Sequence, residues 1–334
     1  MKAIRIRSYG DADVLAVEDV APTAIGPKDL RIAVHASSVN PIDFKLRSGA
    51  QRAIVPLSMP WTLGMDVSGV VTEVGAKVTD FAVGDEVFSS PSHKRMGCYA
   101  EEVVVRADEC AKKPASLTHN EAAALPLVGL TAWNALVDTC DVQPGQKVLI
   151  QAGAGGVGTV AIQLAKHLGA DVYTTCSERN VELLKMLGAD RVIDYRAERF
   201  EDVAKDCDAI LESMGGDHLE RALATVKPRG TVASITPGLP TYTKKHGAFL
   251  GVLVFGLYLV RRVIGARLHN GARLRLVTRK ASGANLAKLA ALVDEGVIRP
   301  VIDRVFALDE VADAHRYLET GRARGKVVLQ VAAA

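Results

Sequence analysis

Three glycines between residues 153 and 158 have the spacing of a turn that binds the pyrophosphate of a dinucleotide. Gly153, Gly155 and Gly158 stand at G-x-G-x-x-G positions, and Gly156 and Val157 lie inside the turn. In such a turn the first glycine lets the chain leave a strand sharply, the second admits the phosphates, and the third lets the next helix pack closely on the sheet. The free amide groups at the start of that helix then bind the anion.

The segments on either side of these glycines have the character that such a site needs. Residues 148–152 form an apolar run that predicts a strand. After the turn, apolar residues at helical spacing predict an amphipathic helix, namely Val160, Ile162, Leu164, Ala165 and Leu168. A glycine turn can also serve packing alone, but this context favours a dinucleotide site.

The next predicted strand, residues 171–177, indicates which dinucleotide is bound. Folds of this kind that are specific for NAD carry an acid at the end of the second strand, about 20 residues after the first glycine. Here the strand ends in the sequence TTCS, which contains no acid. Ser177, Arg179 and Asn180 instead offer a hydroxyl, a guanidinium and an amide, which suit the 2′-phosphate of NADPH. Glu178 argues against this assignment, and we expect its side chain to point outward. We therefore predict NADPH as the cofactor.

The hydrophobic pattern predicts two kinds of structure along the chain. The first third alternates short β-rich runs with turns, which is typical of an antiparallel β-barrel-like domain, with strands expected at 3–7, 30–37, 67–74, 86–89 and 100–105. From Lys147 strands alternate with helices, which predicts a parallel, doubly wound sheet, with strands expected at 148–152, 171–177, 191–194, 209–213 and 231–235. The fold class predicted is α/β.

The last part of the chain changes character again. A helix is expected at 284–295, followed by an extended segment at 302–306, a helix at 308–320 and an extended segment at 326–331. We predict a β domain at residues 1–121, a dinucleotide-binding domain at residues 122–299, and a return of residues 300–334 to the first domain.

Charge is distributed unevenly, although the formal net charge is only +3. The span from Arg221 to Val293 contains thirteen Lys and Arg residues and no Asp or Glu. Within it, residues 248–260 are uncharged and lie between two Lys and two Arg residues. Thirteen apolar residues are too few to cross a bilayer, which takes about 20. We favour a buried or dimer-interface helix here, and a peripheral contact of residues 244–275 with an anionic membrane is the alternative.

Other features exclude several classes of partner and location. The five cysteines are scattered without a C-x-x-C pair, which is typical of reduced thiols. The first residues lack the apolar run of a secretory signal, so we expect a cytoplasmic protein. The basic span is largely aliphatic and has no recognisable nucleic-acid-binding motif, so no nucleic-acid partner is predicted.

Several segments, in order over nearly the whole chain, resemble the zinc-independent quinone oxidoreductases of the medium-chain dehydrogenase/reductase superfamily. They include SVNPIDFKLRSG (38–49), LGMDVSGVVTEVG (63–75), VGDEVF (83–88), AAALPLVGLTAWNAL (122–136), LLKMLGADRVIDY (183–195) and RARGKVVL (322–329). The resemblance implies a GroES-like first domain, a Rossmann second domain with the cofactor between them, and a homodimer. The basic apolar segment also resembles that of reticulon-interacting and chloroplast-envelope oxidoreductases.

The same resemblance predicts that no metal is bound. Zinc alcohol dehydrogenases of the superfamily hold catalytic zinc with Cys and His where this chain has Asn40 and Met65. An amide is a poor zinc ligand, and a thioether suits softer metals. The four closely spaced cysteines of the structural zinc site also have no counterpart between His93 and Cys110.

Asn40, Asp43 and Lys45 are the catalytic candidates that follow from the resemblance. Lys45 stands where the zinc enzymes keep a proton-relay histidine, so it is the first candidate to protonate the product oxygen. A surface or cofactor contact is the alternative for Lys45, and Asp43 fits a helix cap equally well. Tyr99 fits a core aromatic better than a substrate contact. The resemblance adds Thr131, Tyr195 and the backbone near residues 236–238 to the cofactor site.

These observations predict an NADPH-dependent, zinc-independent oxidoreductase. A hydride donor without a Lewis acid reduces an electron-poor carbon most simply, as in quinones or α,β-unsaturated carbonyls, because the incoming charge is delocalised onto an oxygen. The alternative is an NADPH-binding structural or regulatory protein with little turnover, since a fold does not determine a function. In the first case the partner is a small-molecule quinone or enone.

Overall fold

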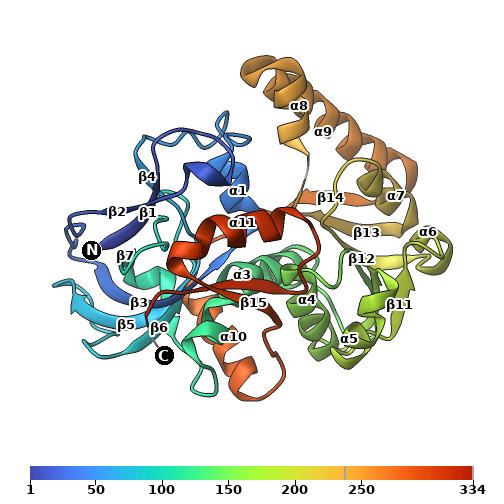
Figure 1. Cartoon of the computed structure of the whole chain (residues 1–334). Coiled ribbons are helices and arrows are strands. Elements are labelled where there is room, and N and C mark those ends of the chain that lie inside the picture. Colours follow the sequence, from blue (N-terminus) through green and yellow to red (C-terminus); the bar gives the residue numbers. More distant parts are fainter. Residues whose placement is uncertain (237, 333–334) are drawn as a thin grey trace. The chain divides into compact units, whose positions relative to one another are not determined.

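The structure is a computed structural model that describes residues 1–236 and 238–332, and it divides into two compact units (Figure 1). The first comprises Met1–Leu130 and Lys280–Ala334, and the second Thr131–Arg279. Both units combine helices with sheets, which confirms the α/β fold class. Their bounds differ from the predicted boundaries at 121 and 299. One reason is that helix α10 (Gly283–Asp294) packs on strand β8 (Cys110–Lys112), so closely that a Cβ at Gly283 would overlap the Cys110 carbonyl oxygen.

The first unit is built on two sheets. The smaller one has the order β2-β1-β4, from Ala16–Asp19, Lys2–Ile6 and Trp61–Thr62, and its pairs are antiparallel. The larger one has the order β15-β16-β3-β5-β6-β8, and β7 also pairs with β3. Its further strands are β3 (Asp29–Val39), β5 (Val67–Val74), β6 (Glu86–Ser89), β7 (Glu102–Arg106), β15 (Ile302–Ala307) and β16 (Lys326–Gln330). The C-terminal strand β16 therefore lies directly beside β3.

Short helices close the ends of these sheets. They are α1 (Pro41–Arg47), α2 (His119–Ala123), α3 (Pro126–Trp133) and α11 (Val311–Glu319), with 3-10 turns η1 (Ala12–Val14), η2 (Ala107–Glu109) and η5 (Leu308–Glu310). One apolar core joins β1, β3, α1 and β16 through Ile4, Val39, Leu46 and Val327. This core places the start of α1, which carries the catalytic candidates, against the C-terminal strand.

The second unit contains the predicted parallel, doubly wound sheet. Its strand order is β11-β10-β9-β12-β13-β14, and every neighbouring pair is parallel. The strands are β9 (Lys147–Ile150), β10 (Asp171–Cys176), β11 (Arg191–Asp194), β12 (Cys207–Glu212), β13 (Val226–Ser234) and β14 (Arg273–Leu276). Strands covered on both faces read as continuous apolar runs, which is why β9 and β12 were predictable. The sequence RLRL of β14 lacks such a run, and this edge strand was not predicted.

Helices cross from each strand of this sheet to the next. They are α4 (Gly156–His167), α5 (Val181–Met186), α6 (Phe200–Val203) and α7 (Asp217–Thr225), with a π-helical turn η3 (Asn134–Thr139) and a 3-10 turn η4 (Glu178–Asn180). The chain runs outward from β9 to β11 and then returns to β12 on the other side of β9. Such a reversal of strand order opens a crevice at the carboxyl ends of the strands, where ligands bind in these folds.

A helical hairpin is inserted between β13 and β14. It consists of α8 (Leu239–His246) and α9 (Ala248–Asn270), and α9 has 23 residues (Figure 1). We expected residues 248–260 to form a buried or a dimer-interface helix. Burial within a single chain is wrong, because most described residues of α9 are exposed. The stretch Phe249–Leu268 has a mean hydropathy of 1.8 and is only 17% buried. By length and composition alone it could cross a membrane.

Candidate functional site

The glycine turn has the geometry that its spacing predicts. A Cβ at Gly153 would overlap the Thr174 hydroxyl of β10, so this position must lack a side chain for the turn to reach the neighbouring strand. A Cβ at Gly158 would lie 2.5 Å from the Ala152 carbonyl oxygen and 2.6 Å from the Gly153 Cα, so α4 packs directly on the turn. Beside Gly155, the nearest atom to such a Cβ is the Ala152 carbonyl oxygen at 3.3 Å. Gly153 and Gly158 thus serve packing, whereas Gly155 borders open space.

The start of α4 meets this open space. The helix begins at Gly156, with Gly155 as its N-cap, and the first amide groups of a helix have no acceptor within the helix. Gly156 and Val157 are partly exposed there. An anionic group beside Gly155 would therefore meet free N–H groups and the positive end of the helix dipole. The turn fits a dinucleotide pyrophosphate.

The polar residues predicted for the cofactor lie at the carboxyl ends of the next two strands. Ser177 follows β10, and its hydroxyl accepts a hydrogen bond from the Asn180 side chain at 3.3 Å. The Asn180 Oδ1 atom is buried and has no hydrogen-bond partner among the residues that the structure describes. Glu178 and Arg179 are exposed. The ends of β9 and β10 are adjacent, because the Gly153 amide donates to the Thr175 carbonyl at 2.9 Å, so these groups border the glycine turn.

Tyr195 and Thr131, which the resemblance added to the cofactor site, have different environments. Tyr195 directly follows β11, is 58% exposed, and donates its amide to the Cys176 carbonyl at the end of β10. It therefore belongs to the same edge of the sheet. Thr131 is buried in α3, which precedes the sheet. Residue 237, within the segment 236–238 that the resemblance also added, lies outside the described residues.

Asn40 and Asp43 form the capped start of α1 and are fully buried. The Asp43 carboxylate accepts hydrogen bonds from the Asn40 amide at 2.8 Å and from the Tyr99 hydroxyl at 2.9 Å. Burial raises the pKa of Asp43 to about 7. Asp43 thus caps the start of α1, and Tyr99 is a buried core aromatic, as the sequence allowed. Proline at the first position of α1 suits this start, because its missing N–H would have no acceptor there.

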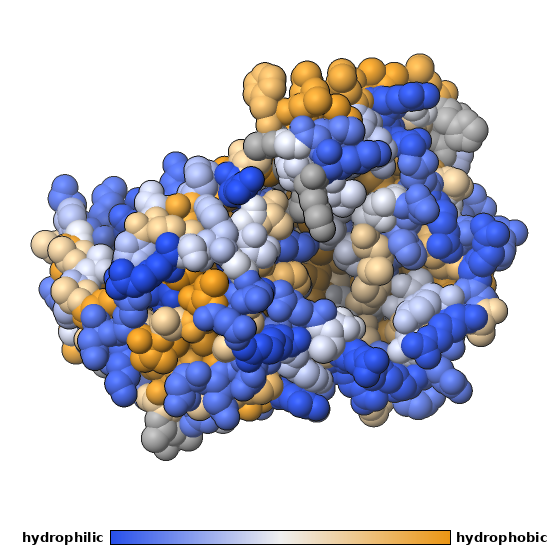
Figure 2. Space-filling model, turned by 45° about the horizontal axis from the view of Figure 1, so that its top comes forward, coloured by the Kyte–Doolittle hydropathy of each residue, from blue (hydrophilic) through white to orange (hydrophobic). Residues whose placement is uncertain are grey.

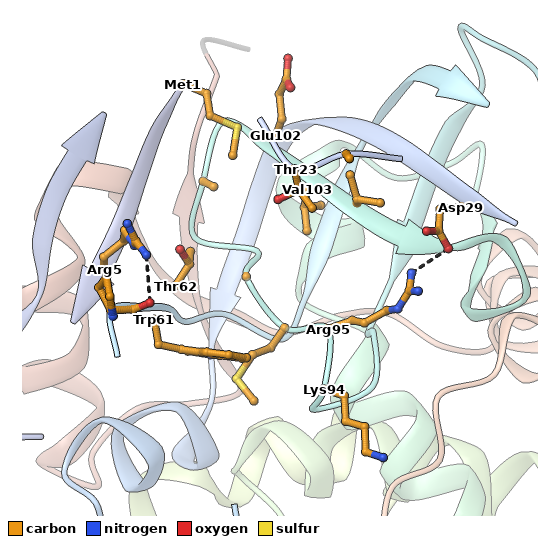
Figure 3. Close-up of a pocket in the computed structure, with 16 residues that line it drawn as sticks. Met1, Arg5, Thr23, Asp29, Trp61, Thr62, Lys94, Arg95, Glu102 and Val103 are labelled. Carbon is orange, nitrogen blue, oxygen red and sulfur yellow. Dashed lines mark hydrogen bonds and ion pairs between the residues drawn. The ribbon is translucent and has the colours of Figure 1, made fainter. Parts of the chain in front are cut away.

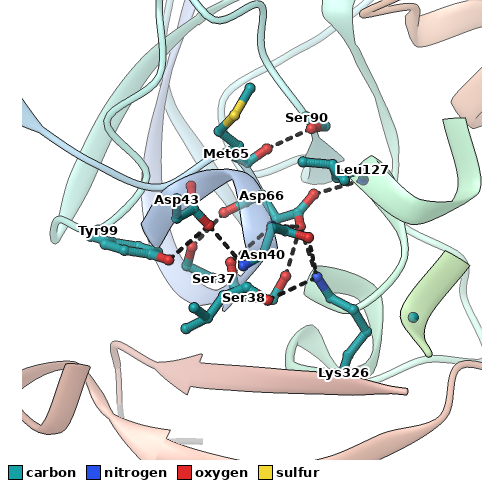
Figure 4. A network of polar contacts seen from close by, with 12 residues as sticks. Ser37, Ser38, Asn40, Asp43, Met65, Asp66, Ser90, Tyr99, Leu127 and Lys326 are labelled. Atoms are coloured by element: carbon teal, nitrogen blue, oxygen red, sulfur yellow. Dashed lines mark hydrogen bonds and ion pairs between the residues drawn. The ribbon is translucent and has the colours of Figure 1, made fainter. Parts of the chain in front are cut away.

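A second buried group, Asp66, ties Asn40 to the end of the chain (Figure 4). Asp66 accepts hydrogen bonds from Asn40 Nδ2 at 2.8 Å, from the Ser38 hydroxyl at 2.7 Å and from the Leu127 amide at 2.7 Å. The Lys326 ammonium lies 3.4 Å from the same carboxylate and donates to Asn40 Oδ1 at 2.5 Å. Burial lowers the pKa of Lys326, although the carboxylates beside it oppose that effect.

A further chain of hydrogen bonds leads from Tyr99 to Glu319. Arg47 forms an ion pair with Glu319 at 2.7 Å and donates to Nδ1 of His315 at 3.1 Å. Burial, with Arg47 beside it, lowers the pKa of His315 to about 3, so its ring is neutral and Nε2 can donate to the Tyr99 hydroxyl at 3.3 Å. Tyr99 in turn donates to Asp43. The start of α1 is therefore held from two sides by buried polar groups.

Lys45 differs from the other two catalytic candidates. It lies in the last turn of α1, is only partly buried, and has no hydrogen-bond or ion-pair partner for its ammonium among residues 1–236 and 238–332. Burial lowers the pKa of this ammonium. A lysine with a lowered pKa that is not paired with a carboxylate can donate a proton more readily than a fully solvated one.

Known proteins match this chain over nearly its whole length. Profiles for the alcohol dehydrogenase GroES-like domain and for zinc-binding dehydrogenase match residues 26–115 and 187–329. "NAD(P)H oxidoreductase RTN4IP1, mitochondrial" of Mus musculus is 39% identical over 99% of this chain and 89% of that protein. The chain belongs to the medium-chain dehydrogenase/reductase superfamily. The resemblance found in the sequence is confirmed.

Two further members of the superfamily add detail. "NADPH-dependent alkenal/one oxidoreductase, chloroplastic" of Arabidopsis thaliana is 35% identical over 98% of this chain and 79% of its own length. The solved structure of the quinone oxidoreductase from Coxiella burnetii is 36% identical, covers 99% of both chains and has a TM-score of 0.85. The first unit of our structure is thus the GroES-like domain with its C-terminal return, and the second is the Rossmann domain.

One of the two matching profiles is that of a zinc-binding dehydrogenase. Asn40 and Met65, the residues in place of the zinc ligands, are both buried. Among the residues that the structure describes, no group of three or more His, Cys, Asp or Glu side chains could hold a metal ion. An amide and a thioether at these two positions do not fit zinc.

Three buried charged residues that bind neighbouring backbone and side chains were not predicted from the sequence, namely Asp66, Lys326 and Glu212. Asp66 and Lys326 lie 260 positions apart in the chain, and no local motif relates them. Glu212 is fully buried at the end of β12 and accepts hydrogen bonds from the amides of Met214 and Gly215 and from the Ser234 hydroxyl. An acid at the end of a buried strand and before two glycines, as in LESMGG, is the signal that could have pointed to Glu212.

The first unit also contains a cavity of about 380 Å³ that is separate from these groups (Figure 3). On its walls Arg5 donates to the Pro60 carbonyl at 2.9 Å, and Arg95 forms an ion pair with Asp29 at 2.7 Å. None of the predicted site residues lines it. We assign no function to this cavity.

Proposed function

We propose that this protein is an NADPH-dependent, zinc-independent reductase that transfers a hydride to quinones or α,β-unsaturated carbonyls. The observation that carries the proposal is the glycine turn, which leaves space at Gly155 and has Ser177, Arg179 and Asn180 beside it. The names of the relatives support the cofactor and the acceptor class. When bound, NADPH supplies the hydride.

Each part of the cofactor has candidate partners in the second unit. The amides at Gly156, Val157 and Gly158 bind the pyrophosphate, since they open α4 beside the space at Gly155. Arg179 and Ser177 bind the 2′-phosphate through charge-assisted hydrogen bonds. The unpartnered Oδ1 of Asn180 accepts a hydrogen bond from the cofactor, and Tyr195 and Thr131 contribute further contacts.

Lys45 is our candidate for protonating the product oxygen. Its ammonium is unpaired within the described residues and has a lowered pKa because of burial. Asn40 and Asp43 act as positioning residues, because their polar atoms face the buried network that holds α1. They would affect turnover through the placement of Lys45 and not by touching the acceptor.

The substitution Arg179→Ala tests the cofactor assignment. We expect the KM for NADPH to rise about tenfold or more, since a hydrogen bond to a charged group is worth about 1.5–3 kcal/mol, while the KM for NADH stays nearly unchanged. Lys185→Ala, which removes an exposed cation of α5, is the matched control. Equal effects on both cofactors contradict the assignment. Tight NADPH binding without NADPH oxidation on a panel of quinones and enones favours the structural or regulatory alternative.

We also propose a homodimer. It is supported by β14, which ends the sheet of the second unit and pairs only with β13 among the described strands. The free edge of such a strand can pair with the same strand of a second copy. The Val277 amide donates to the Ser234 carbonyl of β13, so the amide of the preceding Leu276 points to the free edge. Leu276→Pro removes that amide, and we expect light scattering to show a dimer for the natural chain and a monomer for the variant.

For location, we propose the cytoplasm with a peripheral membrane contact through residues 244–275. All five cysteines are unpaired, which fits a reducing compartment. The membrane contact is supported by the excess of Lys and Arg and the absence of acids between Arg221 and Val293. Fractionation of cells into soluble and membrane pools at low and high salt tests both parts.

A further inference from the structure

The outward face of α9 is an unusually apolar surface. Its apolar side chains recur every three to four residues and therefore share one side of the helix. They form a continuous hydrophobic band on the molecular surface (Figure 2), consisting of Phe249, Leu253, Leu257, Val260, Ile264 and Leu268. Phe249 is 87% exposed, Leu257 64% and Leu268 80%. Soluble proteins rarely leave such a stripe uncovered, so this face needs a partner.

The opposite face of α9 is already packed within its own unit. A Cβ at Gly251 would lie 2.5 Å from the Cα of Thr243, so α8 and α9 are in direct backbone contact there. Phe255 is buried, and its ring lies 5.5 Å from that of Tyr242. Arg262 forms an ion pair with Glu220 of α7. The inward face is therefore satisfied, and the hairpin cannot rotate to bury the outward one without losing these contacts.

The charges around this face favour an anionic partner. Lys245, Arg261 and Arg267 are exposed, and the part of the chain that the structure describes holds no ion-pair partner for any of them. Because residues 239–270 contain no acid, a symmetric contact of the outward face of α9 with the same face of a second copy would bring basic side chains together. Anionic lipid headgroups supply the negative charge that this segment lacks.

The same residues argue against a helix that crosses the bilayer. Arg261 and Arg262 lie inside the stretch Phe249–Leu268, and charged residues at membrane depth are costly. Arg262 is also held by Glu220, and Ala266 packs on the core of the second unit. A helix that keeps one face on its own protein can enter a membrane only along the other face.

We propose that the outward face of α9 is an interfacial anchor that lies in the plane of an anionic bilayer. Phe249, Leu253 and Leu257 insert below the headgroups, while Lys245, Arg261 and Arg267 bind lipid phosphates. This inference rests on the peripheral membrane contact proposed above. It adds that the partner is an anionic lipid bilayer and that α9 inserts along one face. It places the reductase on a lipid surface without a spanning segment.

Co-sedimentation of the full-length protein with vesicles tests this anchor. The vesicles contain phosphatidylcholine alone or with about 30% phosphatidylserine, at low and high salt. We expect binding to the anionic vesicles, weakened by salt. The double variant Leu253→Asp/Leu257→Asp should lower the partition coefficient at least about tenfold, because burial of the two leucines is lost. Met186→Asp places one acid at an exposed apolar residue of α5, away from this face, and should leave binding nearly unchanged.

Three results would overturn or separate the proposals. If Leu253→Asp/Leu257→Asp binds as the natural chain does, while Arg261→Gln/Arg267→Gln does not, the contact is purely electrostatic and insertion is wrong. If the natural chain does not bind and light scattering shows that the leucine variant turns a dimer into a monomer, a second copy covers this face and the membrane contact fails as well. NADPH oxidation with a water-soluble quinone should be equal in all variants, and its absence in the natural chain counts against the reductase alone.

Discussion

Two alanine substitutions in the glycine turn separate the part of the turn that serves packing from the part that serves the cofactor. Gly155 has φ −82° and ψ 169°, which alanine adopts without strain, and a Cβ there would meet only the Ala152 carbonyl oxygen at 3.3 Å. Replacement of an N-cap glycine by alanine costs about 1 kcal/mol or less. We therefore expect Gly155→Ala to fold with a nearly unchanged free energy of unfolding.

The loss in Gly155→Ala should appear in cofactor binding. The added methyl occupies the space where the pyrophosphate approaches the backbone, and overpacking by one methyl group costs about 1–3 kcal/mol. Since 1.4 kcal/mol corresponds to a factor of ten, we expect the Kd for NADPH to rise about five- to hundredfold. Fluorescence titration with NADPH measures this change.

Gly158→Ala should give the opposite pattern. Its Cβ would lie 2.5–2.7 Å from three backbone atoms, which cannot move as the end of a side chain can. Alanine gains up to about 1 kcal/mol of helix propensity over glycine, so a measured loss of about 1–3 kcal/mol in urea unfolding means that the overlap outweighs this gain. If Gly155→Ala binds NADPH as tightly as the natural chain, or is destabilised more than Gly158→Ala, our reading of the turn is refuted.

Three further predictions concern the first unit. Asp43→Asn should remove a pH dependence of stability. Because the pKa of Asp43 is about 7 in the folded chain against an ordinary 3.8, the natural chain loses up to about 1.4 kcal/mol of stability per pH unit as the pH rises between these values. Urea unfolding from pH 4 to 7 should therefore show a free energy of unfolding that falls with pH in the natural chain more steeply than in the variant. Lys326→Met leaves Asp66 buried without its cation and should lower the free energy of unfolding by about 3–5 kcal/mol; a change below about 1 kcal/mol contradicts the role of that pair. Lys45→Met should lower kcat about a hundredfold with unchanged NADPH affinity, whereas an unchanged kcat excludes Lys45 as the proton donor.

The cofactor site was predictable from sequence because its parts are consecutive. The strand before Gly153, the glycines and the helix from Gly156 together span residues 147–167, and each has a local pattern that indicates its structure. The parallel sheet followed for the same reason, since its buried strands are apolar runs. Strand β14 was missed because an edge strand needs no such run.

The buried polar network could not be predicted in this way. Lys326 and Asn40 are 286 positions apart, and they meet because β16 pairs with β3 in the larger sheet. Asn40 and Asp43 look like catalytic groups in the sequence, since nothing local reveals that both are fully buried. Their role in holding α1 depends on tertiary contacts with Asp66 and Tyr99.

By itself, the sequence determined the kind of chemistry that this protein supports. Local steric and periodic rules predict the glycine turn and a second strand that ends without an acid. The resemblance to the family adds that Asn40 and Met65 stand where zinc ligands would be. The tertiary structure decided which of these side chains are buried, because burial is a property of packing between distant segments. Asn40 and Asp43 are buried in the interior, and the Lys45 ammonium is unpaired within the described residues. The apolar stripe of α9 lies on the surface. From sequence alone, the apolar residues of α9 predict a buried helix. The structure shows instead that only the inward face of α9 packs on α8, so the outward apolar stripe stays exposed.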